Sequence, residues 1–89
     1  MMKIIKITSL GCPSCIIMNK VINEIKNIYN EIEYEEYDYD FDDIEEYNVG
    51  KILPVFIFVK NEKEISRLCG EHKKEEFTKI IEENIWKRF

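Results

Sequence analysis

The stretch SLGCPSCIIMNK at residues 9–20 places two cysteines three positions apart at the start of a long segment with helical periodicity. The six residues before it, KIIKIT at 3–8, are rich in β-branched side chains and predict a strand. From Pro13 to about Tyr29, apolar side chains recur at helical spacing. Proline suits the first helical position, because its missing N–H would have no partner there. The stretch therefore predicts a strand, a break and a helix.

Two further elements are predicted between this helix and residue 50. Residues 32–40, IEYEEYDYD, alternate as in a strand, with one step out of phase that suggests a bulge. Residues 41–49, FDDIEEYNV, can form a short helix with Ile44 and Tyr47 facing inward. The first two strands are then joined through a helix, which favours a parallel pair with a right-handed crossover.

The rest of the chain predicts a hairpin and a last helix. VFIFVK at 55–60 is a continuous β-branched and aromatic run, typical of a central strand buried on both faces, and EISRLC at 64–69 follows it after a turn. A helix after Gly70 would carry six large apolar side chains on one stripe: Phe77, Ile80, Ile81, Ile85, Trp86 and Phe89. We therefore predict one α/β domain over residues 1–89, with the order β-α-β-α-β-β-α and one mixed four-stranded sheet flanked by helices.

The composition excludes several classes of function. The formal net charge of -5 argues against a surface that binds nucleic acid or an anionic membrane, because both need clustered Lys and Arg. The sequence contains no run of about 18 apolar residues, so no membrane span is predicted. Its first residues, MMKIIKIT, do not resemble a signal peptide. We expect a cytoplasmic monomer that binds neither nucleic acid nor membrane and needs no cofactor.

The cysteine pair is the strongest functional signal. Three cysteines, an odd number, do not make a disulfide framework, and a cytosolic Cys-x-x-Cys is more often catalytic or metal-binding. The predicted elements place Cys12 at the helix N-cap and Cys15 one turn inside. Thiolate is the nucleophile in disulfide exchange, and a helix N-terminus stabilises it through unpaired N–H groups and partial positive charge. A redox dithiol, with Cys12 attacking and Cys15 resolving, is the first hypothesis; two thiols that simply pack in the core are another.

A metal site is the alternative from a different class of function. Residues 69–72 read as Cys-x-x-His, and Cys69 and His72 together with Cys12 and Cys15 offer three thiolates and one imidazole, which zinc accepts. Such a chain would be a metal-binding or interaction module without catalysis. Against this hypothesis, the two halves of the set lie far apart in the sequence. The Cys69 side chain is also expected to pack inward at its strand end, in the place of a valine.

The order of these features resembles the thioredoxin and glutaredoxin superfamily. The similarity extends from KIIKITSLGCPSC to the final helix, and its second marker is ILPVFIFVKNEKEISRLCG at residues 52–70. In that superfamily a cis-proline before the central strand faces the dithiol, which Pro54 matches, and a glycine closes the next strand, which Gly70 matches. The resemblance implies a thioredoxin-like fold and a small thiol-disulfide oxidoreductase that exchanges electrons with protein disulfides.

The resemblance also implies a substrate groove around the dithiol. Gly11 and Pro13 would lie beside the cysteines, and Gly70 would border the same surface. Pro54 would shape the groove from the opposite side. Leu53 would offer its backbone groups to an extended segment of the substrate.

The sequence departs from both branches of the superfamily. Proline directly after the first cysteine, as in CPSC, is glutaredoxin-like, whereas FVKNEKEISRLCG before an amphipathic helix is more thioredoxin-like. Thioredoxins hold a buried acid six residues before the first cysteine, and this chain has Lys6 there, so the Cys15 proton would go to water, Asp38 or Asp40. Glutaredoxins often place a basic residue before the dithiol to hold glutathione, and SLG supplies none. We therefore expect a reductase of the thioredoxin-reductase type, or another protein donor, rather than glutathione.

Overall fold

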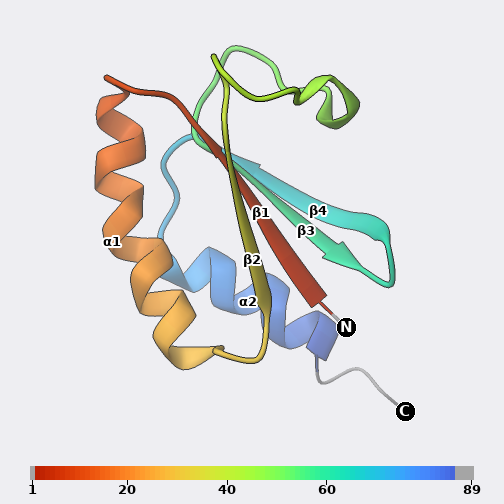
Figure 1. The fold of residues 1–89 in the computed structure, drawn as a ribbon. Helices are drawn as coiled ribbons and strands as arrows, with labels where there is room; N and C mark the ends of the chain where they lie inside the picture. The colour runs from red at the N-terminus through yellow and green to blue at the C-terminus, as the bar shows by residue number, and fades with distance from the viewer. Residues whose placement is uncertain (1, 86–89) are drawn as a thin grey trace.

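The computed structural model describes residues 2–85, and this part of the chain forms four strands, two α-helices and one 3-10 helix (Figure 1). In chain order the elements are β1 (Met2–Thr8), α1 (Pro13–Ile28), β2 (Glu33–Asp38), η1 (Glu45–Tyr47), β3 (Val55–Lys60), β4 (Lys63–Cys69) and α2 (Lys74–Ile85). This is the predicted order, with a single 3-10 turn in the place of the second helix.

The strands form one mixed sheet in the order β2-β1-β3-β4. β1 pairs in parallel with β2 and antiparallel with β3, and β3 and β4 form an antiparallel hairpin. β3 is buried on both faces, since Val55, Phe56, Ile57 and Phe58 are all buried. The predicted parallel pair, hairpin and central strand are therefore confirmed.

Both α-helices cover the same face of the sheet (Figure 1). Between the helices and the sheet lies the larger hydrophobic cluster, to which Met18 and Ile22 contribute from α1 and Phe77 and Ile81 from α2. The ring of Phe77 meets that of Phe56 edge-on, with 4.9 Å between the centroids. This burial of apolar surface holds the two helices in place, and with them the start of α1, where the cysteines lie.

α1 begins and ends close to its predicted positions, and α2 begins after Gly70 as predicted. In α2, Phe77 and Ile81 are buried and Ile80 packs against the same cluster, as the apolar stripe predicts. The remaining predicted members lie outside what the structure describes: the side chain of Ile85, Trp86 and Phe89. Within residues 2–85, neither helix combines the length and the apolar character needed to cross a membrane.

The other face of the sheet is covered by the connection between β2 and β3. Ile44 and Tyr47 pack from this connection against buried side chains of β1 and β3, so their predicted inward orientation is confirmed. The predicted helix over residues 41–49 is wrong in extent, because only Glu45–Tyr47 form a helical turn, and that turn is 3-10.

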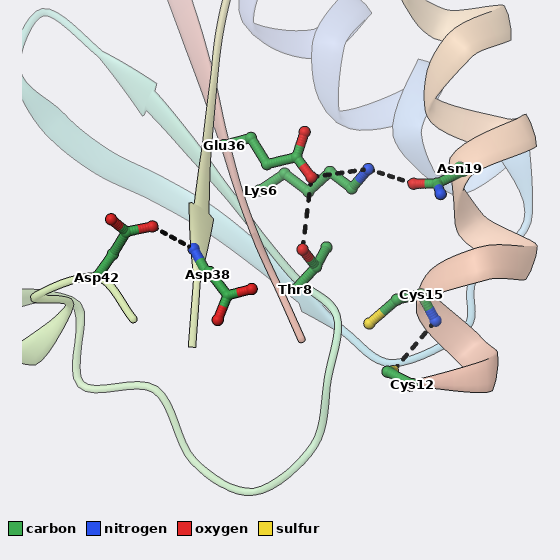
Figure 2. Close-up of polar contacts among 8 residues, drawn as sticks. All are labelled: Lys6, Thr8, Cys12, Cys15, Asn19, Glu36, Asp38 and Asp42. Atoms are coloured by element: carbon green, nitrogen blue, oxygen red, sulfur yellow. Dashed lines mark hydrogen bonds and ion pairs between the residues drawn. The ribbon is translucent and has the colours of Figure 1, made fainter. Parts of the chain in front are cut away.

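Aspartate side chains explain why no longer helix forms here. The Asp38 carboxylate accepts hydrogen bonds from the backbone N–H groups of Asp40 (2.8 Å) and Phe41 (3.2 Å). The Asp42 carboxylate in turn accepts one from the N–H of Asp38 at 2.6 Å (Figure 2). The Asp43 carboxylate also accepts a hydrogen bond from the N–H of Glu45 at 3.3 Å, a group that a helix over 41–49 would use for its own hydrogen bonds, and such bonds compete with a helix. The aspartates therefore fix a turn directly after β2.

The bulge predicted in the second strand is also wrong. β2 pairs with β1 in unbroken register from Lys3↔Glu33 to Thr8↔Asp38, and the one irregular step of the sheet lies between β3 and β4, at Phe58/Val59. The change of phase has another cause: Tyr34 packs against the cluster under the helices, and Tyr37 packs against the cluster on the opposite face. Because both faces of the sheet are covered, a regular strand can bury apolar side chains at even-numbered and at odd-numbered positions.

Candidate active site

A short turn carries the chain from the end of β1 to the first cysteine. Gly11 has φ of 77°, in the left-handed region that glycine adopts without strain. The N–H of Cys12 then bonds back to the carbonyl oxygen of Ser9 at 3.4 Å. This turn brings Cys12 to the N-terminus of α1.

Cys12 caps the helix with its own sulfur. Its backbone is extended, with φ of -89° and ψ of 109°, and its Sγ accepts a hydrogen bond from the N–H of Cys15 at 3.2 Å (Figure 2). Pro13 occupies the first helical position, and the first turn contains no acidic residue. A donated N–H and the helix N-terminus both favour a negatively charged sulfur. The predicted N-cap position of Cys12 is confirmed.

The segment before β3 meets the dithiol from the opposite side. The Leu53–Pro54 peptide bond is cis, as the resemblance implies, and Pro54 is fully buried. The thiol of Cys12 lies 3.9 Å from the carbonyl oxygen of Leu53. The carbonyl oxygen of Pro54 accepts a hydrogen bond from the N–H of Gly70 at 2.8 Å. Three segments far apart in the sequence therefore meet at the half-buried Cys12.

Gly70 allows this close approach. It has φ of 84°, and a Cβ atom at this position would lie 3.2 Å from Cγ2 of Ile52. Ile52 itself is 64% exposed, beside the Leu53–Pro54 bond. Glycine is therefore favoured by the backbone conformation, and a larger residue would also press against the Ile52 side chain. Gly70 itself is buried, so it contributes to the surroundings of the dithiol only through its backbone.

Cys15 lies one turn inside α1 and is buried, with 4% of its surface exposed. Burial raises the pKa of its thiol to about 11, and the hydrogen bond with Cys12 adds to the rise. A backbone hydrogen bond from Ser9 and the positive charge of Lys6 act in the opposite direction. At neutral pH Cys15 is therefore a protected, protonated thiol. This is the state expected of a resolving cysteine, which reacts only after a mixed disulfide has formed.

The aspartates suggested as proton acceptors have other partners. The Asp38 carboxylate is occupied by the turn after β2, and Asp40 accepts a hydrogen bond from the Ser9 hydroxyl at 2.7 Å. Among the contacts found within residues 2–85, neither aspartate is bonded to Cys15. The acceptor of the Cys15 proton therefore stays a prediction, with water as the acceptor that needs no rearrangement of these aspartates.

The structure does not assemble the alternative metal site. Within residues 2–85, no three His, Cys, Asp or Glu side chains gather as metal ligands. The ring of His72 instead contacts the carboxylate of Glu76 at 2.7 Å and the carbonyl oxygen of Cys69 at 2.9 Å. The prediction that Cys69 packs inward is wrong, because its side chain is exposed at the end of β4, an edge strand. The neighbouring Leu68 is the one that packs against the core.

Two contacts between a serine and a carboxylate beside the dithiol were not predicted from the sequence, although Asp40 was suggested there as a proton acceptor. Ser9 donates to Asp40, and Ser14 donates to Glu71, each at 2.7 Å, and both carboxylates are exposed. One serine precedes the cysteines and the other lies between them. The acids come from the turn after β2 and the loop after β4, so their sequence positions give no sign of the contact. An acidic rim around the dithiol is therefore a property of the folded chain.

The fold is that of the thioredoxins. A thioredoxin from Nicotiana alata superimposes with a TM-score of 0.82 at 28% identity, covering 92% of this chain and 71% of that one. Thioredoxin-2, described as a component of the malaria parasite protein secretion machinery, gives a TM-score of 0.85 at 17% identity, with 93% and 82% covered. Thioredoxin from Fasciola hepatica gives 0.79 at 21% identity, with 90% and 78% covered.

These similarities confirm the predicted fold class, and the chain has a thioredoxin-like fold. No protein-family model matches the sequence, and no curated protein matches it either. The similarity to thioredoxins therefore lies in the fold, and Cys12 and Cys15 have the Cys-x-x-Cys spacing.

Proposed function

We propose that this protein is a small thiol-disulfide oxidoreductase that reduces protein disulfides with Cys12 as nucleophile and Cys15 as resolving thiol. The observation that carries the proposal is the position of the Cys12 sulfur. It caps α1, accepts the N–H of Cys15 at 3.2 Å and faces the Leu53 carbonyl beside a buried cis-proline. A thioredoxin-like fold, the fold of thiol-disulfide oxidoreductases, supports the same class of activity.

The reaction requires two exchanges. The thiolate of Cys12 attacks one sulfur of the substrate disulfide; a Cys12–substrate S–S bond forms, and the other substrate sulfur leaves as a thiolate that takes a proton from water. Cys15 then gives its proton to water and attacks the Cys12 sulfur. The second substrate sulfur leaves, and the protein retains a Cys12–Cys15 disulfide. Two electrons have passed to the substrate.

The surface around Cys12 suits a protein segment as substrate. Leu10 is 79% exposed and Ile52 is 64% exposed, and Gly11 and Pro13 are exposed between them. Exposed apolar side chains next to a reactive group are typical of a binding surface. A protein substrate would cover them while the Leu53 backbone aligns its disulfide. The buried Pro54 and Gly70 would act through their backbone and shape.

The charge of the same surface argues for a protein electron donor. Glutathione is anionic at neutral pH, and the serine before the cysteines and the serine between them hold the carboxylates of Asp40 and Glu71. No Lys or Arg occurs from Thr8 to Asn19. We therefore propose a flavin-dependent reductase of the thioredoxin-reductase type as donor and, because a reduced dithiol must be maintained, the cytoplasm as its location.

Coupled assays test both the activity and the donor. With insulin as substrate, NADPH oxidation is followed with thioredoxin reductase, or with glutathione and glutathione reductase, at matched reducing capacity. We expect saturable turnover with thioredoxin reductase and about tenfold less with glutathione, a factor that corresponds to about 1.4 kcal/mol of unfavourable charge. A double variant with Asp40→Asn and Glu71→Gln should reduce the difference in turnover between the two donors if the carboxylates cause it. Efficient turnover with glutathione and none with thioredoxin reductase would overturn the choice of donor.

A further inference from the structure

Lys6 has an unusual position for a lysine. Side chains alternate along β1, so Ile5 and Ile7 enter the cluster on one face while Lys6 points to the face covered by α1. It is 8% exposed, and it is the one charged residue within residues 2–85 that is buried. Burial of an ammonium group is costly unless it is paired, so its partners decide what it can do.

Two partners hold the Lys6 ammonium beneath α1. It donates a hydrogen bond to Oδ1 of Asn19, and it lies 3.7 Å from the carboxylate of Glu36, its register partner on β2. Glu36 also accepts a 3.4 Å hydrogen bond from Thr8. Asn19 lies one helical turn beyond Cys15, on the same side of α1. The ammonium is therefore fixed under the part of the helix that carries the resolving thiol.

Figure 2 shows the consequence for Cys15. Its sulfur points from α1 toward the end of β1, on the face of the sheet where Lys6 and Thr8 lie. The positive charge of Lys6 also acts on this thiol, in the direction opposite to burial. Glu36 weakens the effect only in part, because its side chain is 59% exposed and hence well solvated.

We propose that Lys6 is a positioning residue for the resolving step, whose buried ammonium, anchored by Asn19 and Glu36, stabilises the thiolate of Cys15 when Cys12 is held in a mixed disulfide. The inference rests on the proposed function. Cys15 gives its proton to water, its thiolate attacks Cys12, and the substrate sulfur leaves with the electron pair of the broken bond. Lys6 keeps its proton throughout and contributes only its charge.

Other charged groups also face this region. Burial holds the pKa of Tyr34 at about 12, so that it stays neutral. The loop before α2 brings His72, which is paired with Glu76. A cavity between α1 and the sheet is lined by Lys6, by Lys26 from α1 and by Glu36 from β2; Glu35 also borders it, but its carboxylate accepts a hydrogen bond from Tyr37, on the opposite face of the sheet. Glu35 has its own partner in Lys3, at 3.1 Å. Lys6 is therefore the one cation, among the described residues, found to act on the Cys15 thiol.

The test separates the two exchanges in time. In a Cys69→Ser background, reduced protein is mixed with the aromatic disulfide dithiobis(nitrobenzoate) in a stopped-flow instrument. Attack by Cys12 releases the first coloured thiolate, and resolution by Cys15 releases the second. The two phases are recorded as a function of pH for Lys6→Met, for Lys6→Arg and for Lys20→Met, a control at an exposed lysine of α1.

In Lys6→Met we expect the second phase to slow about tenfold and its pH profile to move up by about one unit, the shift that the loss of one nearby opposite charge produces. Lys6→Arg should retain most of the rate, and Lys20→Met should behave as the parent. Circular dichroism confirms that each variant is folded. A second phase in Lys6→Met equal to that in Lys20→Met, or an equal loss in Lys6→Arg, overturns the role of the charge. Absence of the first phase in the parent would instead contradict the proposed function.

Discussion

Replacement of Cys12 by serine should reduce the catalysed reduction of insulin to the rate of dithiothreitol alone. A hydroxyl at this position is not ionised at neutral pH and cannot carry out disulfide exchange, so the nucleophile is lost while the cap of α1 is kept, since serine is a good N-cap residue. Insulin precipitation in the presence of dithiothreitol measures the effect.

Two matched variants accompany this experiment. Cys15→Ser should retain the first exchange and accumulate Cys12–substrate mixed disulfides, which are visible by mass spectrometry under non-reducing conditions. Cys69→Ser should retain full activity, because Cys69 is exposed at the end of β4 and takes no part in the proposed exchanges. If Cys69→Ser abolishes activity, or if Cys12→Ser remains active, the assignment of the nucleophile is wrong.

Replacement of Phe77 by alanine should cause the largest loss of stability. Phe77 is fully buried, and its ring lies 4.9 Å from that of Phe56 and 5.8 Å from that of Phe58, centroid to centroid. Truncation of such a residue costs about 3–5 kcal/mol, because the cavity that remains does not collapse completely. Small domains have a total free energy of unfolding of about 5–15 kcal/mol, so the variant should be largely destabilised.

Urea denaturation followed by circular dichroism measures this free energy. Ile28→Ala is the control, since Ile28 is a large apolar side chain that is 54% exposed at the end of α1. It should change the free energy of unfolding by about 0.5 kcal/mol or less. Equal effects of the two substitutions would show that α2 is not anchored through Phe77.

The sequence predicted the elements that are set by local patterns. The helix after Pro13 and the strand at 55–60 are strongly periodic or continuously apolar, and both lie where the patterns place them. The N-cap position of Cys12 also follows from local order, because a proline and a helix directly succeed it. These features need no knowledge of distant contacts.

The errors occur where distant or competing contacts decide the structure. The helix expected at 41–49 is replaced by a turn, because Asp38 and Asp42 bond to backbone groups of the turn after β2 and Asp43 bonds to the N–H of Glu45, which a helix would use. The exposure of Cys69 depends on which strand forms the edge of the sheet, and strand order cannot be read from one strand.

The surroundings of the dithiol were equally hard to predict. The contact of Ser14 with Glu71 joins residues from the two ends of the chain, and the burial of Lys6 depends on how α1 crosses β1. A lysine in a strand is most simply predicted to face solvent. The resemblance placed Lys6 at the position of the family's buried acid, but its partners Asn19 and Glu36 come from distant segments and could not be predicted.

A redox titration tests the central claim most directly. The protein is equilibrated in glutathione buffers of graded potential, quenched with acid, alkylated and mapped by peptide mass spectrometry. We predict one two-electron transition, with a disulfide between Cys12 and Cys15 in the oxidised form and a free thiol at Cys69 throughout. A disulfide that joins either of the first two cysteines to Cys69, or no reversible disulfide between Cys12 and Cys15 at any potential, would contradict the account.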